Sequence, residues 1–230
     1  MELKKDRFLY HLWTKESGFS SMLVLLFVMH FIVIPLFGSY PRFMVILNIF
    51  WILFLFAGIF SLSKNKEQAI RLSIIPILFV VVQWIAFFTA IPIVVFADLI
   101  LSVAIMLLLI TLVLIKVLEP GSVTIYRIIG SIVVYMLLAN LWCVVYLFVF
   151  RHIEGSFQMT VSPFAMSSEQ SNFLYFSYIT ITSTGYGEIL PIHPFARSLV
   201  QVEVLTGILY PVILIGRLVG NANFSLKKIN

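Results

Sequence analysis

The feature that most constrains this chain is a series of apolar stretches, each long enough to cross a lipid bilayer. The longest, Leu72–Val117, runs for 46 residues with almost no polar interruption. As one helix it would measure about 69 Å at 1.5 Å per residue, which is more than twice the roughly 30 Å of a bilayer's hydrocarbon core. It must therefore hold two spans. Because proline disfavours helix in the residue before it, Ala90-Ile91-Pro92 is the predicted turn between them.

Apolar stretches of similar character recur along the chain and predict six membrane-spanning helices. With 61% hydrophobic and 11% charged residues, the sequence departs far from soluble domains, which are about 45–50% apolar and about 25% charged. We therefore predict an all-α, polytopic membrane protein embedded in a lipid bilayer. Its spans are expected at 19–37, at 43–62, twice within 72–117, at about 127–150 and at about 195–220.

The distribution of basic residues predicts the orientation of the chain. If the N-terminus is cytoplasmic, twelve lysines and arginines fall inside and three fall outside, namely Arg42, Arg151 and Arg197, as the positive-inside rule requires. Both termini then lie in the cytoplasm and the chain lies in the cell membrane, plasma or inner. Because the basic residues sit at helix ends, the net charge of +5 predicts membrane topology and no nucleic-acid partner. The polar lead 1–18 fits an interfacial amphipathic helix and a charged flank equally well.

A short helix is predicted between the last two spans. Residues 168–182 form a helical pattern of about fifteen residues, too short to cross a bilayer. Ser167 and Gln170 make a capping box at its start, and Glu169 suits the positive end of a helix. A helix that enters and stops must turn back, and non-helical backbone at that depth is tolerated only where it is buried or lines water. Residues 183–188 are therefore predicted to line an aqueous path in the outer half of the membrane.

The residues of this loop suit the coordination of a dehydrated cation. Rings of backbone carbonyls replace an ion's water without placing formal charge in the membrane. Aiming successive carbonyls at one axis requires alternating right- and left-handed backbone conformations, which Gly185 and Gly187 adopt cheaply. Ser183 adds a hydroxyl oxygen at the inner end, and Tyr186 is expected to brace the loop against the short helix. The negative C-terminal end of that helix would favour a cation.

These residues resemble a known family. Residues 182–188, TSTGYGE, are similar to the potassium-channel filter pattern T-T-V-G-Y-G-D, and the last span, with Arg197 and Gly207 at matching spacing, resembles the inner helix of prokaryotic members. The resemblance covers roughly 127–220, while the first four spans match six-span members only in number. The resemblance implies a homotetrameric channel that passes monovalent cations. It places the selectivity filter at Thr182, Ser183, Thr184, Gly185, Tyr186 and Gly187, with K⁺ bound at Ser183, Thr184, Gly185 and Tyr186. It also implies an outer mouth at Glu188 and a gating hinge at Gly207 and Pro211.

The predicted domains follow from these boundaries. They are a cytoplasmic lead at 1–18, a four-helix transmembrane domain at 19–118, a linker at 119–126, a pore domain at 127–220 and a short cytoplasmic tail at 221–230. Within the pore domain we expect the pore helix at 168–182, the filter at 183–187 and the inner helix at 195–220. K⁺ in the filter is the only ion or cofactor that the resemblance implies.

Several positions depart from the family pattern. Ser183 replaces a threonine and lacks the methyl group that limits its rotamers, and Thr184 replaces a valine and needs a hydrogen-bond partner. Where the family often has two tryptophans, this chain has Tyr175 and Phe176. Tyr175 is predicted to donate a hydrogen bond to Glu188, whereas Phe176 has no donor. These departures leave a weakly selective cation channel as the alternative, ahead of a subunit of a secondary K⁺ transporter.

Isolated polar residues within the spans are predicted to make contacts between helices. Glu203, as filter support, is expected to make a structural contact behind the short helix. For Asp98, a structural hydrogen bond and a role in gating both stay open. The remaining residues of this kind are expected to form interhelical hydrogen bonds; they are His30, Asn48, Gln83 and Asn140.

The sequence also argues against other mechanisms. Residues 93–116 carry one basic residue, Lys116, whereas steep voltage gating needs several charges per subunit at about 2.3 kcal/mol per charge and 100 mV. We therefore predict weak voltage dependence or none. Four scattered histidines and the single Cys143 give no metal-ligand set, and no serine, histidine and acid cluster suggests catalysis, so we predict that the chain is not an enzyme.

Overall fold

The structure, a computed structural model, is mostly helical. It describes residues 18–37, 40, 91–119, 124–160 and 168–226, together with isolated positions between 50 and 89. Within these residues, four helical segments are long and apolar enough to cross a membrane: Gly18–Phe37, Pro92–Val117, Ile125–His152 and Pro194–Arg217. The expected spans 43–62 and 72–90 fall largely outside the described residues, as do the lead 1–17, Asn48 and Gln83, so the total of six spans stays a prediction.

The first membrane helix changes its winding partway along. It consists of α2, Gly18–Val28, followed by a π-helical turn η1, Met29–Val33, and by α3, Ile34–Phe37. Pro35 lies just beyond the π turn. Because a proline has no N–H for the carbonyl of residue 31 and its ring crowds that carbonyl, a locally wider turn is the expected accommodation. We refer to Gly18–Phe37 as the first helix.

A helix begins at Pro92, the last residue of the predicted turn. Helix α6 spans Pro92–Val117, with Pro92 in its first turn and Ile91 as an extended N-cap residue at φ −68° and ψ 126°. Proline fits the first helical turn because the N–H it lacks would have no helical partner there. At the other end, Lys116 forms an ion pair with Glu119 at 3.6 Å.

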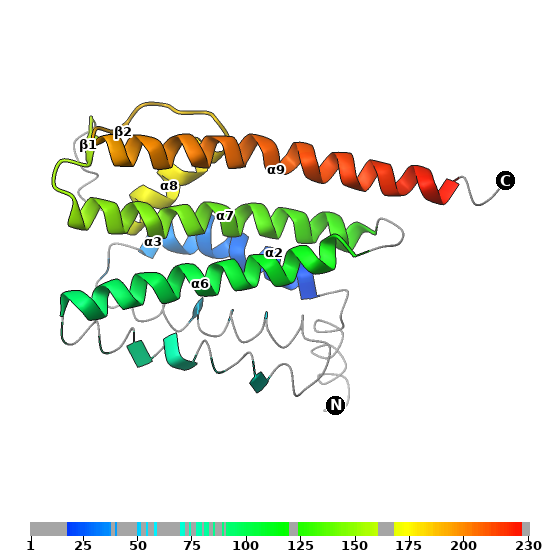
Figure 1. The fold of residues 1–230 in the computed structure, drawn as a ribbon, viewed down its shortest axis with the longest axis horizontal. Helices are drawn as coiled ribbons and strands as arrows, with labels where there is room; N and C mark the ends of the chain where they lie inside the picture. The colour runs from blue at the N-terminus through cyan, green and yellow to red at the C-terminus, as the bar shows by residue number, and fades with distance from the viewer. Residues whose placement is uncertain are drawn as a thin grey trace. The chain divides into compact units, whose positions relative to one another are not determined.

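The part of the chain with the polar loop forms a compact unit of its own. Two units divide the chain by contact, the first made of 1–29, 42–119 and 124–134, and the second of 30–41, 120–123 and 135–230. The second unit contains most of α7 (Ile125–His152), followed by β1 (Phe157–Met159), α8 (Glu169–Ile181), β2 (Ile189–Pro191) and α9 (Pro194–Leu226). Within it α8 packs against α9, and the chain runs from α8 through a loop into β2 (Figure 1).

Two boundaries differ from the sequence-based prediction. The N-cap of α8 is Ser168 and not Ser167: Ser168 has extended backbone, φ −70° and ψ 153°, and its hydroxyl oxygen accepts a hydrogen bond from the Ser171 N–H at 3.2 Å. Helix α9 continues past the expected end at 220 to Leu226. No proline follows Pro211, and a single glycine such as Gly220 costs a helix only about 1 kcal/mol, which does not end it.

Candidate functional site

Helix α8 is fixed at its N-terminal end by the helix before it. Besides the Ser168 cap, the Glu169 carboxylate accepts a hydrogen bond from Arg151 Nε, at the end of α7, at 2.8 Å. The thiol of Cys143 donates to the carbonyl of Gln170 at 3.6 Å. The carboxylate also lies in the first turn, where it complements the helix dipole. These contacts set where α8 starts and thus where its C-terminal end delivers the polar loop.

The backbone N–H groups of the loop fold back onto the last turn of α8. Thr182 N donates to the Tyr178 carbonyl at 3.2 Å, and Ser183 N to the Thr180 carbonyl at 2.9 Å. The N–H groups of Thr184 and Gly185 both reach the Ile179 carbonyl, at 2.8 and 3.1 Å. These bonds satisfy carbonyls that a helix end otherwise leaves without partners, and they hold the loop close under α8.

The loop alternates its backbone handedness at every second residue. Ser183, Gly185 and Gly187 have positive φ, at 58°, 54° and 85°. This is the alternation that the chemistry of a carbonyl-lined path requires, and it extends one step further than the two glycines indicate. A Cβ built on Gly185 or Gly187 would meet nothing within 4 Å, so these glycines are needed for conformation and not for space.

Ser183 is the residue whose conformation the sequence does not reveal. Among the described residues it is the only non-glycine with a positive φ. A left-handed conformation costs an ordinary L-residue roughly 1–2 kcal/mol, and strain of this kind clusters at functional sites. A serine gives no reason to expect a positive φ. The only feature of the sequence that points to it is the two-residue spacing from Ser183 to Gly185 and Gly187.

The side chains of the loop face outward from this chain. Thr182 to Gly187 are all exposed. The partner that Thr184 needs is Thr182, since the two hydroxyl oxygens lie 2.9 Å apart, and Thr182 Oγ1 also donates to the Tyr178 carbonyl at 2.7 Å. The expectation that Tyr186 braces the loop against the short helix stays a prediction. In the single chain its side chain is 70% exposed.

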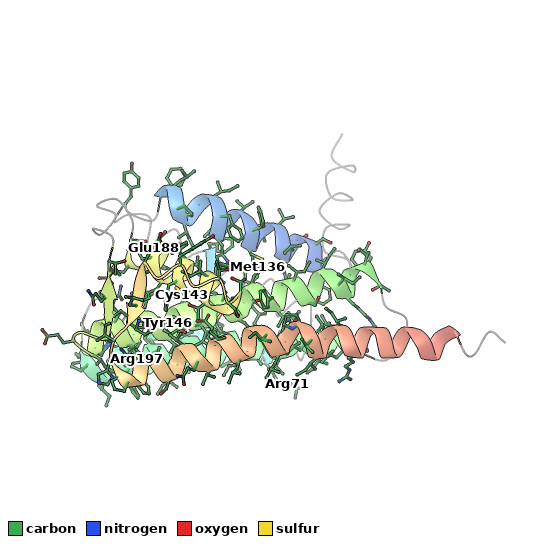
Figure 2. All side chains as sticks on the ribbon, turned by 90° about the horizontal axis from the view of Figure 1, so that it is seen from above. Arg71, Met136, Cys143, Tyr146, Glu188 and Arg197 are labelled. Carbon is green, nitrogen blue, oxygen red and sulfur yellow. The ribbon has the colours of Figure 1, made fainter. Side chains whose placement is uncertain are left out.

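The outer end of the loop is held by two hydroxyl groups. The hydrogen bond predicted from Tyr175 to the Glu188 carboxylate is present at 2.7 Å, and Glu188 lies on the loop that leaves α8 (Figure 2). Burial, together with this bond and the charge of Glu188, raises the pKa of Tyr175 to about 12. Thr160 Oγ1 donates to the carbonyls of Gly187 and Glu188, at 3.4 and 3.1 Å. No motif or spacing in the sequence indicates a role for Thr160.

Thr160 reaches the loop because it extends a small antiparallel sheet. Strands β1 and β2 pair with Phe157 opposite Pro191 and Met159 opposite Ile189, and the next bond along the ladder runs from Thr160 N to the Glu188 carbonyl at 2.9 Å. The segment before α8 and the segment after the loop are thus joined. Arg197, at the start of α9, adds a bond from Nε to the Pro191 carbonyl at 3.1 Å.

Glu203 makes the contact behind α8 that the sequence predicts. Its side chain is fully buried, and its carboxyl group is bonded by the hydroxyls of Tyr146 on α7 and Ser177 on α8. Ser177 Oγ also reaches the Ala139 carbonyl at 2.7 Å. Figure 2 labels Tyr146 on α7, one turn beyond Cys143. Since a buried carboxyl is costly without partners, this cluster fixes α7, α8 and α9 to one another.

Phe176 supports α8 through aromatic packing rather than through the loop. Its ring lies edge-on to Tyr146, with centroids 5.2 Å apart, and edge-on to Phe157 of β1 at 5.7 Å. Phe173 and Phe157 are also edge-on, at 5.1 Å. Aromatic pairs in this geometry contribute about 0.5–1.5 kcal/mol each beyond their burial. Phe176 therefore belongs to a cluster behind α8 and does not touch the outer mouth by a hydrogen bond.

Gly207 packs directly against the base of the loop. A Cβ on this residue would lie 1.9 Å from the Ile181 carbonyl oxygen, so the backbones of α9 and α8 approach too closely for any side chain. The same carbonyl accepts a hydrogen bond from Tyr135 on α7 at 2.9 Å, and Tyr135 stacks on Tyr210 of α9 at 5.9 Å. Pro211 lies within α9 and offers no N–H to the Gly207 carbonyl. The hinge assigned to Gly207 and Pro211 stays a prediction.

These features define a class of protein. The described residues contain helices long and apolar enough to cross a membrane and one short helix, and the loop after that short helix alternates in handedness and is exposed from Thr182 to Gly187. Residues 123–221 match the model of a family described as ion channel. The chain is thus a membrane protein in which residues 123–221, from α7 through α8 into α9, are similar to a two-helix ion channel domain. Neither curated proteins nor solved structures gave a match.

Proposed function

We propose that this protein is a potassium-selective ion channel that passes K⁺ passively through a filter formed by residues 182–187 of four identical chains. The ions are its cargo, and they bind at Ser183, Thr184, Gly185 and Tyr186 without any chemical step. The ion channel domain at 123–221 supports the general function. The specific proposal rests on the geometry of the loop.

The observation that carries the proposal is which of the loop's backbone N–H and carbonyl groups have hydrogen-bond partners. Its N–H groups at 182–185 are bonded to α8, whereas the carbonyls of 183–186 accept none of the backbone hydrogen bonds found among the described residues. With handedness alternating at 183, 185 and 187, these carbonyls are available to an ion on the exposed side. Backbone carbonyls of this kind replace an ion's hydration shell in potassium filters.

One chain supplies only part of such a site. An ion needs oxygens on all sides, and a single loop lies on one side of it. In the single chain Thr182–Gly187 are exposed and Tyr186 is 70% exposed, as expected for a surface that other copies cover. The apolar residues exposed along α9 agree with this; they include Val202, Leu205, Leu209 and Val212. We therefore propose a homotetramer, with both termini cytoplasmic in the plasma or inner membrane.

A weakly selective cation channel is the second candidate. The observation that favours it is the pair of hydroxyls at Thr182 and Thr184, which bond each other at 2.9 Å, where the potassium-channel pattern has an apolar valine at the second position. A hydroxyl there can exchange partners, so the loop can adopt more than one spacing. The two candidates differ in one measurable quantity, the permeability ratio of K⁺ to Na⁺.

Voltage is not expected to gate the channel steeply. Helix α6 carries one basic residue, Lys116, in its last turn, where it is paired with Glu119. One charge already near the membrane surface moves through little of the potential, and each full charge contributes only about 2.3 kcal/mol per 100 mV. We expect a shallow conductance–voltage curve in a planar bilayer.

The test is ion flux with purified protein reconstituted into liposomes, followed by single-channel recording between K⁺ and Na⁺ solutions. Wild type should pass K⁺, with a reversal potential near that of K⁺, and chemical crosslinking should give a tetramer. Gly185→Ala should abolish the flux, because φ 54° strains alanine. Gly155→Ala is the matched control, since Gly155 has φ 67° and also has open space around a Cβ, but it lies in the turn before β1.

The outcomes separate the alternatives. A reversal potential near zero between K⁺ and Na⁺ would support the weakly selective channel. Equal loss of flux in Gly155→Ala and Gly185→Ala would show that strain alone, and not the filter, explains the effect. No flux from folded, reconstituted wild type, or a conducting monomer or dimer, would refute the proposal.

A further inference from the structure

His30 is a buried polar residue in the middle of the first helix. It lies in the π-helical turn Met29–Val33 and is only 3% exposed. A π turn inside an α-helix carries one extra residue per turn and is frequent at functional sites. The chain also passes from the first compact unit to the second between Met29 and His30. His30 therefore belongs to the same compact unit as the loop.

The side chain of His30 is bonded to α8. Its Nδ1 lies 2.8 Å from the hydroxyl oxygen of Tyr178, and the two rings meet edge-on with centroids 5.8 Å apart. Phe31 packs on the same tyrosine ring at 5.2 Å, and the side chain of Asn140 on α7 is a further hydrogen-bonding neighbour of His30. This confirms the interhelical hydrogen bond predicted for His30, and it identifies α8 as the helix on the other side.

Tyr178 is also bonded to the filter by its backbone. Its carbonyl accepts from the Thr182 N–H at 3.2 Å and from Thr182 Oγ1 at 2.7 Å. Thr182 Oγ1 in turn lies 2.9 Å from Thr184 Oγ1. The hydroxyl of Tyr178 is thus bonded to His30, and its backbone carbonyl is bonded to Thr182. Thr182 in turn is bonded to Thr184.

We infer that His30 is a positioning residue for the filter and that it couples the first helix to ion conduction. The inference rests on the proposed function and extends it by giving the first helix a role. A shift or rotation of the π turn moves the ring that holds Tyr178. Because the Tyr178 carbonyl holds Thr182, the same movement changes the spacing of the innermost filter residues. The filter is then the gate, and the first helix is the element that biases it.

The experiment compares reconstituted variants in which each end of the His30–Tyr178 bond is removed. Tyr178→Phe keeps the ring and its packing but loses the hydroxyl, and His30→Ala removes the other partner. Each should change the open probability or the K⁺/Na⁺ permeability ratio by about threefold to tenfold, the range expected for one buried hydrogen bond. His30→Gln, which keeps polar atoms on a side chain of similar length, should restore part of the effect.

A double-mutant cycle and a control make the test specific. If the two residues act through their bond, the variant with both His30→Ala and Tyr178→Phe should change conduction no more than either single variant. Thr111→Val is the matched control, because among the described residues the Thr111 hydroxyl bonds to the Leu107 carbonyl of its own helix, at 2.7 Å. It should leave both quantities unchanged.

Each result decides something different. If wild type conducts and Tyr178→Phe keeps wild-type open probability and permeability ratio, the inference is wrong while the proposed function stands. Additive effects in the double variant would equally refute coupling through the bond. If His30→Ala fails to assemble, Tyr178→Phe and His30→Gln still give the readout. If wild type carries no K⁺ flux, the proposed function fails first and the inference falls with it.

Discussion

Gly207→Ala is the substitution whose effect can be worked most directly from the structure. The new methyl carbon would lie 1.9 Å from the Ile181 carbonyl oxygen, while real contacts of this kind essentially never fall below 3.0 Å. The end of α8 and the middle of α9 must therefore separate by about 1 Å. Overpacking of this kind costs typically 1–3 kcal/mol, and displacing Ile181 also endangers its hydrogen bond from Tyr135, worth about 1 kcal/mol.

The same helix provides the control for this substitution. Gly216→Ala makes the same chemical change in α9, but a Cβ there meets nothing within 4 Å, so it should gain up to about 1 kcal/mol of helix propensity. We expect Gly207→Ala to be less stable than Gly216→Ala by roughly 2–4 kcal/mol, and to lose K⁺ flux because Ile181 directly precedes Thr182. Thermal unfolding and liposome flux on both variants measure this difference.

Gly207→Ala also distinguishes a steric requirement for glycine at this position from a requirement for a flexible hinge. If the glycine is needed because two backbones touch, stability and flux fall together. If it serves only as a hinge, the open probability changes while the stability of Gly207→Ala stays at that of Gly216→Ala. A Gly207→Ala protein as stable and as conductive as the control would refute the steric argument altogether.

Three further predictions concern the support of the filter. Thr160→Val should shorten the time for which the channel stays conducting, since the Gly187 carbonyl loses the hydroxyl donor and the Glu188 carbonyl keeps only the backbone N–H of residue 160. Thr111→Val should not, and equal recordings from the two would contradict the role of Thr160. Glu203→Ala should destabilise the protein by about 2–4 kcal/mol in unfolding measurements, because the buried Tyr146 hydroxyl loses its acceptor and the contacts between α7, α8 and α9 are weakened. Glu203→Gln, which keeps an acceptor oxygen, should cost less than half of that, and equal losses would contradict the assignment. The Tyr175 pKa is raised to about 12, so its neutral, hydrogen-bond-donating form persists as pH rises past the ordinary value near 10 and is lost only around 12. We therefore expect K⁺ flux to stay level from pH 7 to 10. A fall in flux centred near pH 10 that Tyr175→Phe abolishes would show that the bond to Glu188 does not raise the pKa.

The fold of the site was largely predictable from local sequence. The turn at Pro92 follows from proline's effect on the preceding residue, and the start and end of α8 lie within one residue of 168–182. Both are decided by short-range chemistry, namely a missing N–H in one case and a serine cap in the other. The bond from Tyr175 to Glu188 was predictable for a different reason: the family resemblance aligned the two positions.

What the sequence does not reveal depends on contacts between distant segments. Thr160 and Glu188 are joined because β1, which precedes α8 in the sequence, pairs with β2, which follows it. A strand of three residues is too short for an alternating pattern to predict it. His30 and Tyr178 are 148 positions apart, and each alone is an ordinary residue of an apolar helix. Gly207 was assigned by its spacing to a hinge, whereas its closeness to Ile181 gives it a steric reason that spacing cannot show.

The contacts around the proposed filter compensate for one another at the positions that depart from the family pattern. Phe176 cannot donate a hydrogen bond, and its ring packs in the aromatic cluster behind α8. The outer end of the loop is instead held from two directions, by Tyr175 on α8 and by Thr160 beyond β1. Since the N–H groups at the inner end are bonded to the last turn of α8, any movement of α8 reaches the inner residues directly, while the outer residues are also held by the sheet. Conformational change in this filter should therefore begin at its inner end, at Thr182, which is the end joined to His30.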